Sequence, residues 1–281
     1  MGTSSSSSGP GSGISFDPPW LDDISKGSTE SVQELTDPNS PAPSPSDNQS
    51  IVPPIELAPP RRFANARRQL GEFISNGNRA NLRKALGHYS RRGMGGATNV
   101  AQRMRASTSL GAGLYQFLHD IQSPQTPMLD EWLHNISQRN LSDEDISNEI
   151  IAHVFSDGGS LDEESCKRSM SQAMADLLEA IPDVDLLHLS NNDIWFLLER
   201  FLANEAFSRV ELDIGQMFES AKYSDTNVVL RMNEVRAYLI SEISVQVEAL
   251  ERNVQNPSFK EIQGILHDAI EQTFSIFEEE V

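Results

Sequence analysis

The sequence predicts an all-α protein: a multi-helix, bundle-like body preceded by a long disordered amino-terminal tail. From residue 61 onward, apolar side chains recur at intervals of three and four, the period of a helix, and seldom at the interval of two that strands require. Residues 1–60 hold most of the prolines, a run of five serines and few large apolar side chains. Such a segment cannot bury enough surface to offset the entropy of ordering, so we expect it to be disordered.

The predicted tail has three parts. Residues 2–13 are small and polar, and residues 37–60 carry eight prolines that favour an extended spacer. Between them lies an apolar cluster that we interpret as a docking motif, because an exposed aromatic face gains by packing against a partner. The motif consists of the apolar residues Phe16, Trp20 and Leu21 and of Asp22 and Asp23, which would lie at the rim of the partner's pocket. The alternative is that this segment folds back on the helical body.

The body is predicted as a succession of helices. They occupy about residues 61–74, 81–90, 98–104, 110–121, 142–155, 160–181, 190–202, 226–253 and 258–279, with a further short helix within 217–223. Serines followed by acidic residues indicate helix starts at 142, 160 and 190. Residues 91–96 (RRGMGG) are predicted to be a flexible loop. The chain thus divides into the tail (1–60), a basic helical segment (61–123) and an acidic helical domain (124–281).

Charge is segregated along the chain. The net charge is −19, yet residues 61–105 hold eleven basic residues and one acidic residue. Such a block attracts either an acidic protein surface, of this chain or of a partner, or the phosphates of nucleic acid. We favour the protein surface, because few aromatic side chains interleave with the basic ones to stack on bases. The candidate basic face consists of Arg61, Arg62, Arg67, Arg68, Arg79, Arg83, Lys84, Arg91 and Arg92.

No catalytic constellation stands out. The six histidines form no HxxxH or HExxH pair, and the single cysteine, Cys166, has no recognisable base beside it. The glycines at 93, 95 and 96 lack the lysine of a phosphate-binding loop. We find neither a run of eighteen apolar residues nor an apolar leader. We therefore predict a non-enzymatic cytoplasmic protein that binds no metal, cofactor or membrane; a lone cysteine fits a reducing compartment.

The amino terminus offers a reactive group. Gly2 is small enough for Met1 to be removed, which leaves an unhindered glycine amine on a serine-rich tether. Gly2 and Ser6 also fit the myristoylation pattern, although no basic patch accompanies them to strengthen membrane binding.

Several stretches carry a family resemblance. Residues 1–6 (MGTSSS), 9–13 (GPGSG) and 19–22 (PWLD), together with 80–89 (ANLRKALGHY) and 95–98 (GGAT), resemble the QatB family of the bacterial Qat anti-phage defence systems. The resemblance is clearest over residues 1–22 and 61–120 and weaker over the acidic helices.

This resemblance implies partners rather than an activity. Qat systems pair the family with an ATPase (QatA), a QueC-like enzyme (QatC) and a TatD-like nuclease (QatD). A QueC-like enzyme activates a carboxylate with ATP and then needs an amine. The implied function is an adaptor and modification substrate: Gly2 accepts a 7-deazaguanine group, and the enzyme recognises Thr3, Ser4 and Ser5. The alternative is a nucleic-acid-binding module that uses the basic helices of residues 61–105.

Overall fold

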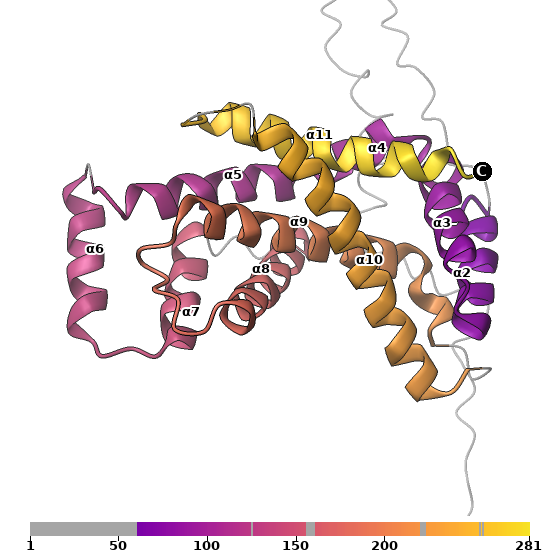
Figure 1. The fold of residues 1–281 in the computed structure, drawn as a ribbon, viewed down its shortest axis with the longest axis horizontal. Helices are drawn as coiled ribbons and strands as arrows, with labels where there is room; N and C mark the ends of the chain where they lie inside the picture. The colour runs from indigo at the N-terminus through magenta and orange to yellow at the C-terminus, as the bar shows by residue number, and fades with distance from the viewer. Residues whose placement is uncertain (1–60, 125, 156–160, 220–222, 253, 255) are drawn as a thin grey trace, which may run out of the picture. The chain divides into compact units, whose positions relative to one another are not determined.

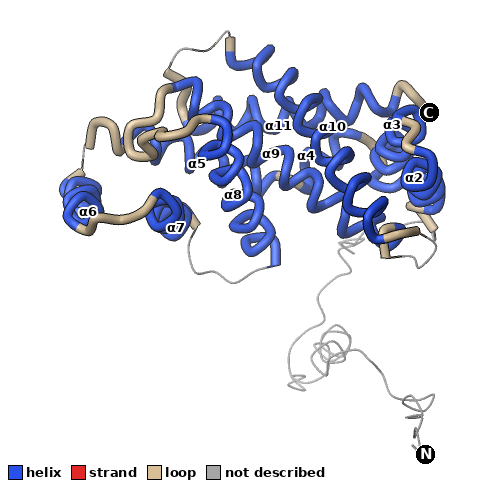
Figure 2. Tube along the Cα trace, turned by 60° about the horizontal axis from the view of Figure 1, so that its bottom comes forward, coloured by secondary structure: helices blue, strands red, loops and turns tan. Residues whose placement is uncertain are grey.

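The computed structural model describes residues 61–124, 126–155, 161–219, 223–252, 254 and 256–281, and all regular structure within them is helical (Figure 2). This confirms the predicted all-α class. The predicted tail, residues 1–60, lies outside the described residues. The helices are α2 (Ala64–Asn76), α3 (Arg79–His88), the π-helix η1 (Tyr89–Met94), α4 (Ala97–Arg103), α5 (Arg105–Asp120), α6 (Pro127–Gln138), α7 (Asp143–Val154), α8 (Leu161–Ala180), α9 (Asn191–Ile214), the 3-10 helix η2 (Gly215–Met217), α10 (Asp225–Glu251) and α11 (Phe259–Glu278).

Helix α9 is the central element of the body (Figure 1), and it contacts α5, α8 and α10. Its buried residues lie on all sides of the helix, as expected where neighbours surround it. Three of them are ionisable, namely Glu199, Glu205 and Arg209, and the fully buried Glu205 pairs with Arg209 across 3.1 Å. The hydroxyl of Ser165 on α8 also donates to Glu205. These buried polar residues interrupt the apolar pattern, which is why the sequence predicts a helix that stops near residue 202 whereas α9 continues to Ile214.

Helix α11, near the end of the sequence, packs against the basic helices α3 and α4. It has one apolar face, and it contacts α3, α4, α5 and α10 (Figure 1, yellow). Leu266, Ile270 and Phe274 on that face are at most 1% exposed. Burial of such side chains stabilises a fold by about 1.5–3 kcal/mol each. The acidic carboxy-terminal helix therefore covers the basic amino-terminal helices.

Helix starts follow local sequence closely. Ser142 and Ser190 each cap a helix in a reciprocal box with the acid three residues on, which confirms both predicted starts. Ser258 does the same for α11. Ser160, the third predicted cap, lies outside the described residues.

The prediction of a flexible loop over residues 91–96 was wrong. Residues 89–94 form the π-helix η1, which extends α3, and Tyr89 and Ser90 in it are fully buried. Gly93 permits this packing, because a Cβ there would lie 2.3 Å from the ring of Phe63. Gly95 and Gly96 then turn the chain into α4 with positive φ angles of 81° and 119°.

Helix α6 was not predicted. Thr126 caps it, Pro127 occupies its first turn, and only Leu129 and Ile136 of its residues are buried. So few buried positions give little helical periodicity in the sequence. The predicted short helix within 217–223 is replaced by η2, which ends at Met217; residues 220–222 lie outside the described part of the chain.

Residues on both sides of position 123 belong to one compact unit that extends to Val281. The division into a basic segment and an acidic domain stays a prediction about charge. None of the helices within the described ranges combines the length and apolar composition needed to cross a membrane.

Candidate functional site

The candidate basic face lies on α2, α3 and η1 and on the residues just before α2. Eight of its nine residues are exposed, and Arg67 is half-buried. The helices that carry them contact one another, and α3 and η1 also contact α11. The structure thus gathers the predicted basic residues on adjoining elements and sets three of them, Arg67, Arg83 and Arg91, against distant parts of the chain.

Asp213, in the last turn of α9, connects the basic helices to α9 through hydrogen bonds. Its carboxylate accepts hydrogen bonds from Arg103 at 2.7 and 3.3 Å and from the hydroxyl of Tyr89 at 3.0 Å. Its main-chain oxygen accepts a further bond from Arg67 at 2.8 Å. Burial, with the charge of Asp213 adding to it, raises the pKa of Tyr89, so the phenol keeps its proton and remains a donor.

The residues that follow α11 contact a second group of basic-face residues. Arg83 donates to the hydroxyl of Tyr238 at 3.1 Å and pairs with Glu280 at 3.5 Å. Arg91 donates to the main-chain oxygen of Val281. Together with Arg67 on Asp213, and Arg68 on Glu72 of its own helix, four of the nine predicted residues bond to this chain itself.

Five cations of the basic face remain available. Within the described residues they form no ion pair, although the guanidinium of Arg62 lies 4.7 Å from the ring centroid of Phe63; they are Arg61, Arg62, Arg79, Lys84 and Arg92. Burial lowers the pKa of His88, and the charges of Arg92, Arg68 and Lys84 lower it further. These three cations therefore act on one imidazole, and the local potential is positive, although Arg68 is paired with Glu72. We call the five the free basic residues.

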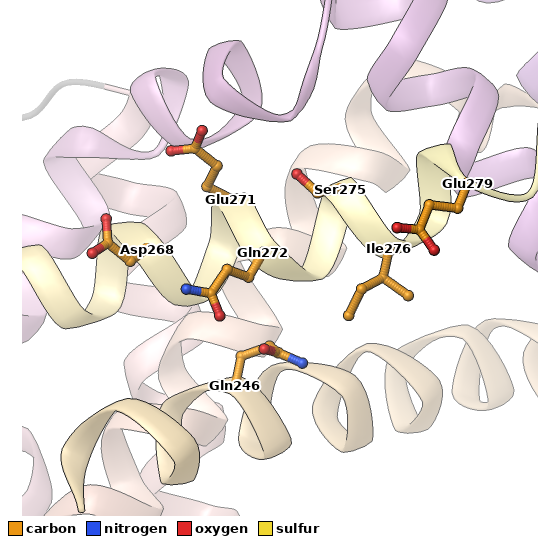
Figure 3. Close-up of a pocket in the computed structure, with 7 residues that line it drawn as sticks. All are labelled: Gln246, Asp268, Glu271, Gln272, Ser275, Ile276 and Glu279. Carbon is orange, nitrogen blue, oxygen red and sulfur yellow. The ribbon is translucent and has the colours of Figure 1, made fainter. Parts of the chain in front are cut away.

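A groove of opposite charge lies between α10 and α11 (Figure 3). Its volume is about 500 Å³. Gln246 projects into it from α10, α11 contributes the acids Asp268 and Glu271, and Glu279 follows directly after α11. The body therefore presents an acidic groove as well as a basic face.

One group of side chains within the described residues could hold a metal ion. Ligand atoms of His267, Asp268 and Glu271 lie within 4.8 Å of one another on α11. Each carboxylate is already engaged: Glu271 accepts from Thr98 at 2.7 Å, and Asp268 lies 3.5 Å from the imidazole of His267. Sequence reasoning missed this group because its spacing is not one of the usual metal motifs. We assign no metal to it.

Cys166 is unsuited to nucleophilic chemistry. It is fully buried, and burial raises the pKa of its thiol to about 12. The reactive thiolate is therefore absent near neutral pH. This agrees with the interpretation of Cys166 as a non-catalytic helix residue.

The predicted tail sites lie outside the described residues and stay predictions. They are the acceptor Gly2, the recognition residues Thr3, Ser4 and Ser5, and the docking motif Phe16, Trp20, Leu21, Asp22 and Asp23.

Fold and surface together define an all-helical protein with a basic face that is partly neutralised by its own acidic helices. Residues 95–277 match the family model described as Qat anti-phage system associated protein QatB, and the chain belongs to this family. The match confirms the resemblance, and it includes the acidic helices, where the resemblance is weaker. No curated protein and no solved structure matches the chain. The family places the chain in a multi-component anti-phage defence system.

Proposed function

We propose that this chain is a non-catalytic adaptor and protein substrate of a Qat defence system, and that it acts in the cytoplasm. Membership of the QatB family carries the proposal, because it assigns the chain to a system of several components. The finer role rests on the sequence: Gly2 supplies a primary amine after removal of Met1, and Thr3, Ser4 and Ser5 form a slim polar tether. The proposed partners are a QueC-like enzyme, an ATPase and a TatD-like nuclease.

The modification we propose is formation of an amide. The QueC-like partner transfers AMP from ATP to a carboxylate on 7-deazaguanine and releases pyrophosphate. The deprotonated amine of Gly2 attacks the carboxyl carbon of this mixed anhydride. A C–N bond forms, the C–O bond to the phosphate breaks, AMP leaves with the electron pair, and the attacking nitrogen loses a proton to solvent. The product is a 7-deazaguanine amide on Gly2.

The adaptor role is supported by the free basic residues. Arg62, Lys84 and Arg92 are exposed cations that the acidic helices of this chain do not pair within its described part. An acidic surface of the ATPase is the contact we propose for them, because complementary charge speeds association and selects the partner. The docking motif around Trp20 would hold a second partner.

Mass spectrometry of the amino-terminal peptide tests the acceptor role. The chain is expressed alone and with its partners, as the natural sequence and as Gly2→Pro, whose secondary amine is hindered. Ser12→Pro is the matched control, since it adds the same ring to the tail and leaves the Gly2 amine intact. We expect a partner-dependent adduct on the natural chain and on Ser12→Pro but not on Gly2→Pro. An adduct on Gly2→Pro, or none on the natural chain, rules out the acceptor role.

Co-purification tests the docking motif. Trp20→Ala removes the largest apolar face of the cluster, so recovery of at least one Qat partner with the tagged chain should fall. Ser28→Ala, in the polar sequence that follows, is the control. If Trp20→Ala recovers every partner as well as the control does, the motif is not a docking site.

Nucleic-acid binding is the second candidate, and the cations around His88 favour it. Reversing the charge of Lys84 and Arg92 together should then abolish a salt-sensitive shift of labelled DNA or RNA. The control is Lys260→Glu, on an exposed lysine of α11. No binding by the natural chain at low salt eliminates this candidate.

A further inference from the structure

A pocket of about 390 Å³ lies where the end of α5 meets the start of α9 and the segment that leads into α11. Its volume is in the range of sites for small organic ligands. The residues that define its chemistry are Tyr115, His119, Gln122, Asn191, Trp195 and Asn256. It is separate from the basic face and from the groove between α10 and α11.

The floor of this pocket is aromatic and rigid. Tyr115 and Trp195 are only 4% and 5% exposed, and their ring centroids lie 5.3 Å apart. The imidazole of His119 stacks on Tyr115, with 6.3 Å between centroids and 10° between planes. The exposed imidazole of His119, held against these buried rings, offers a fixed face on which a planar ligand loses little entropy on stacking.

The side-chain amides of Asn191 and Gln122 lie at the rim, and each makes one hydrogen bond within the protein. The hydroxyl of Tyr115 donates to Asn191 Oδ1 at 3.0 Å, which leaves the Nδ2 donor of Asn191 without a partner among the described residues. Gln122 Nε2 donates to the main-chain oxygen of Leu189 at 2.7 Å, and this leaves Gln122 Oε1 without a donor in the same part of the chain. Each amide is thus held by one hydrogen bond and presents its other polar atom.

The donor at Asn191 depends on the protonation of Tyr115. Burial raises the pKa of Tyr115, and the charge of Glu251 raises it further. The phenol therefore keeps its proton at neutral pH and continues to hold the amide of Asn191 in one orientation. The nearby carboxylate also disfavours an anionic ligand in this pocket.

We propose that this pocket binds the base of a purine nucleoside. The π-face of the base stacks on the aromatic floor, and a neighbouring donor and acceptor on the edge of the base meet Gln122 Oε1 and Asn191 Nδ2. A purine base suits this pocket because it is a planar ring that can stack on the aromatic side chains and carries adjacent donors and acceptors for the two amides. The proposal goes beyond the function proposed above and does not depend on Gly2.

The indole N–H signals of 15N-labelled protein test this proposal, with Trp195→Phe identifying the signal of Trp195. The probes are adenosine and guanosine, and ribose is the control ligand without a base. We expect either nucleoside to move the Trp195 signal, and not that of Trp132, with a dissociation constant on the order of 1 mM. Ribose should have no effect at about 10 mM, roughly ten times that constant.

Two matched substitutions locate the polar contact. Asn191→Asp keeps the oxygen that accepts from Tyr115 but replaces the Nδ2 donor, and should weaken binding about fivefold or more. Asn192→Asp makes the same change on the next residue, which is exposed and outside the pocket, and should leave binding within about twofold. Circular dichroism verifies that both variants keep their helices. Each of three results would overturn the proposal. The first is that neither nucleoside moves the Trp195 signal, the second is that ribose moves it equally, and the third is that Asn191→Asp and Asn192→Asp bind alike.

Discussion

Asp213 offers the sharpest test of how this fold is held together. Its carboxylate joins Arg103 and Tyr89 of the basic segment to the end of α9, and its side chain is 11% exposed. The substitution Asp213→Asn keeps the shape of the side chain but removes the charge and one of its two acceptor oxygens. The main-chain bond from Arg67 to residue 213 is not affected by this change.

The structure sets the size of the expected effect. Hydrogen bonds to charged groups contribute about 1.5–3 kcal/mol each, and breaking a fully buried ion pair costs about 3–5 kcal/mol. Arg103 is 31% exposed, so water can replace part of what it loses. We therefore expect Asp213→Asn to lower the free energy of unfolding by about 2–3 kcal/mol, and Tyr89→Phe, which removes one hydrogen bond to this carboxylate, by about 1.5 kcal/mol.

Urea denaturation followed by circular dichroism at about 222 nm measures both changes, because the body is helical. The control is Glu149→Gln. Glu149 pairs with Arg139 across 2.6 Å, but the two side chains are 32% and 55% exposed, so about 0–1 kcal/mol is expected. If Asp213→Asn costs no more than Glu149→Gln, burial does not make the Asp213 contacts strong and our reasoning fails.

Three further predictions concern the interior. Burial, together with the charges of acids on α10, raises the pKa of Glu199 from 4.5 to about 7, so the folded protein holds a proton that the unfolded chain releases. Stability should therefore fall between about pH 4.5 and pH 7, and Glu199→Gln should remove about 2–3 kcal/mol of that fall, as urea titrations across pH would show. Gly87→Ala should cost about 2 kcal/mol, since its Cβ would lie 2.2 Å from the main-chain oxygen of Phe277, whereas Gly264→Ala, with nothing within 4 Å, should stabilise α11 by about 0.5–1 kcal/mol. Cys166 should resist a thiol reagent until urea unfolds the chain, because its pKa is about 12.

Each of these has a clear contrary result. Parallel stability curves for Glu199→Gln and the natural chain would show that Glu199 titrates normally. Equal effects of the two glycine substitutions would contradict the close approach at Gly87. Rapid labelling of Cys166 in the folded protein would contradict its burial.

The helix starts were the most predictable features, because their causes are local. Ser142 and Ser190 each bond to an acid three residues away, and that pattern is visible in the sequence. The π-helix was not predictable in the same way. Glycines and arginines over residues 91–96 favour a loop on local grounds, and only the ring of Phe63 against Gly93 and the burial of Tyr89 stabilise a helix there.

The residues of the basic face could be predicted from the sequence, but the partners of these residues could not. The nine basic-face residues were identified from the charge of one segment, and the structure gathers them on adjoining helices. Only the pair of Arg68 with Glu72 is local, whereas Arg67, Arg83 and Arg91 bond to residues 213, 280 and 281, far away in the sequence. No spacing rule connects such residues, so the free cations could be named only once the helices were packed.

The sequence by itself determined the all-α class, the helix starts at Ser142 and Ser190 and the segregation of charge. These depend on interactions over a few residues or on composition. Only the tertiary structure decided that α9 is surrounded by other helices, that Asp213 joins the basic helices to it, and that Tyr115 and Trp195 form the floor of one pocket. The physical reason is that burial and charge pairing depend on distances in space, and those are set jointly by all the helices that pack together.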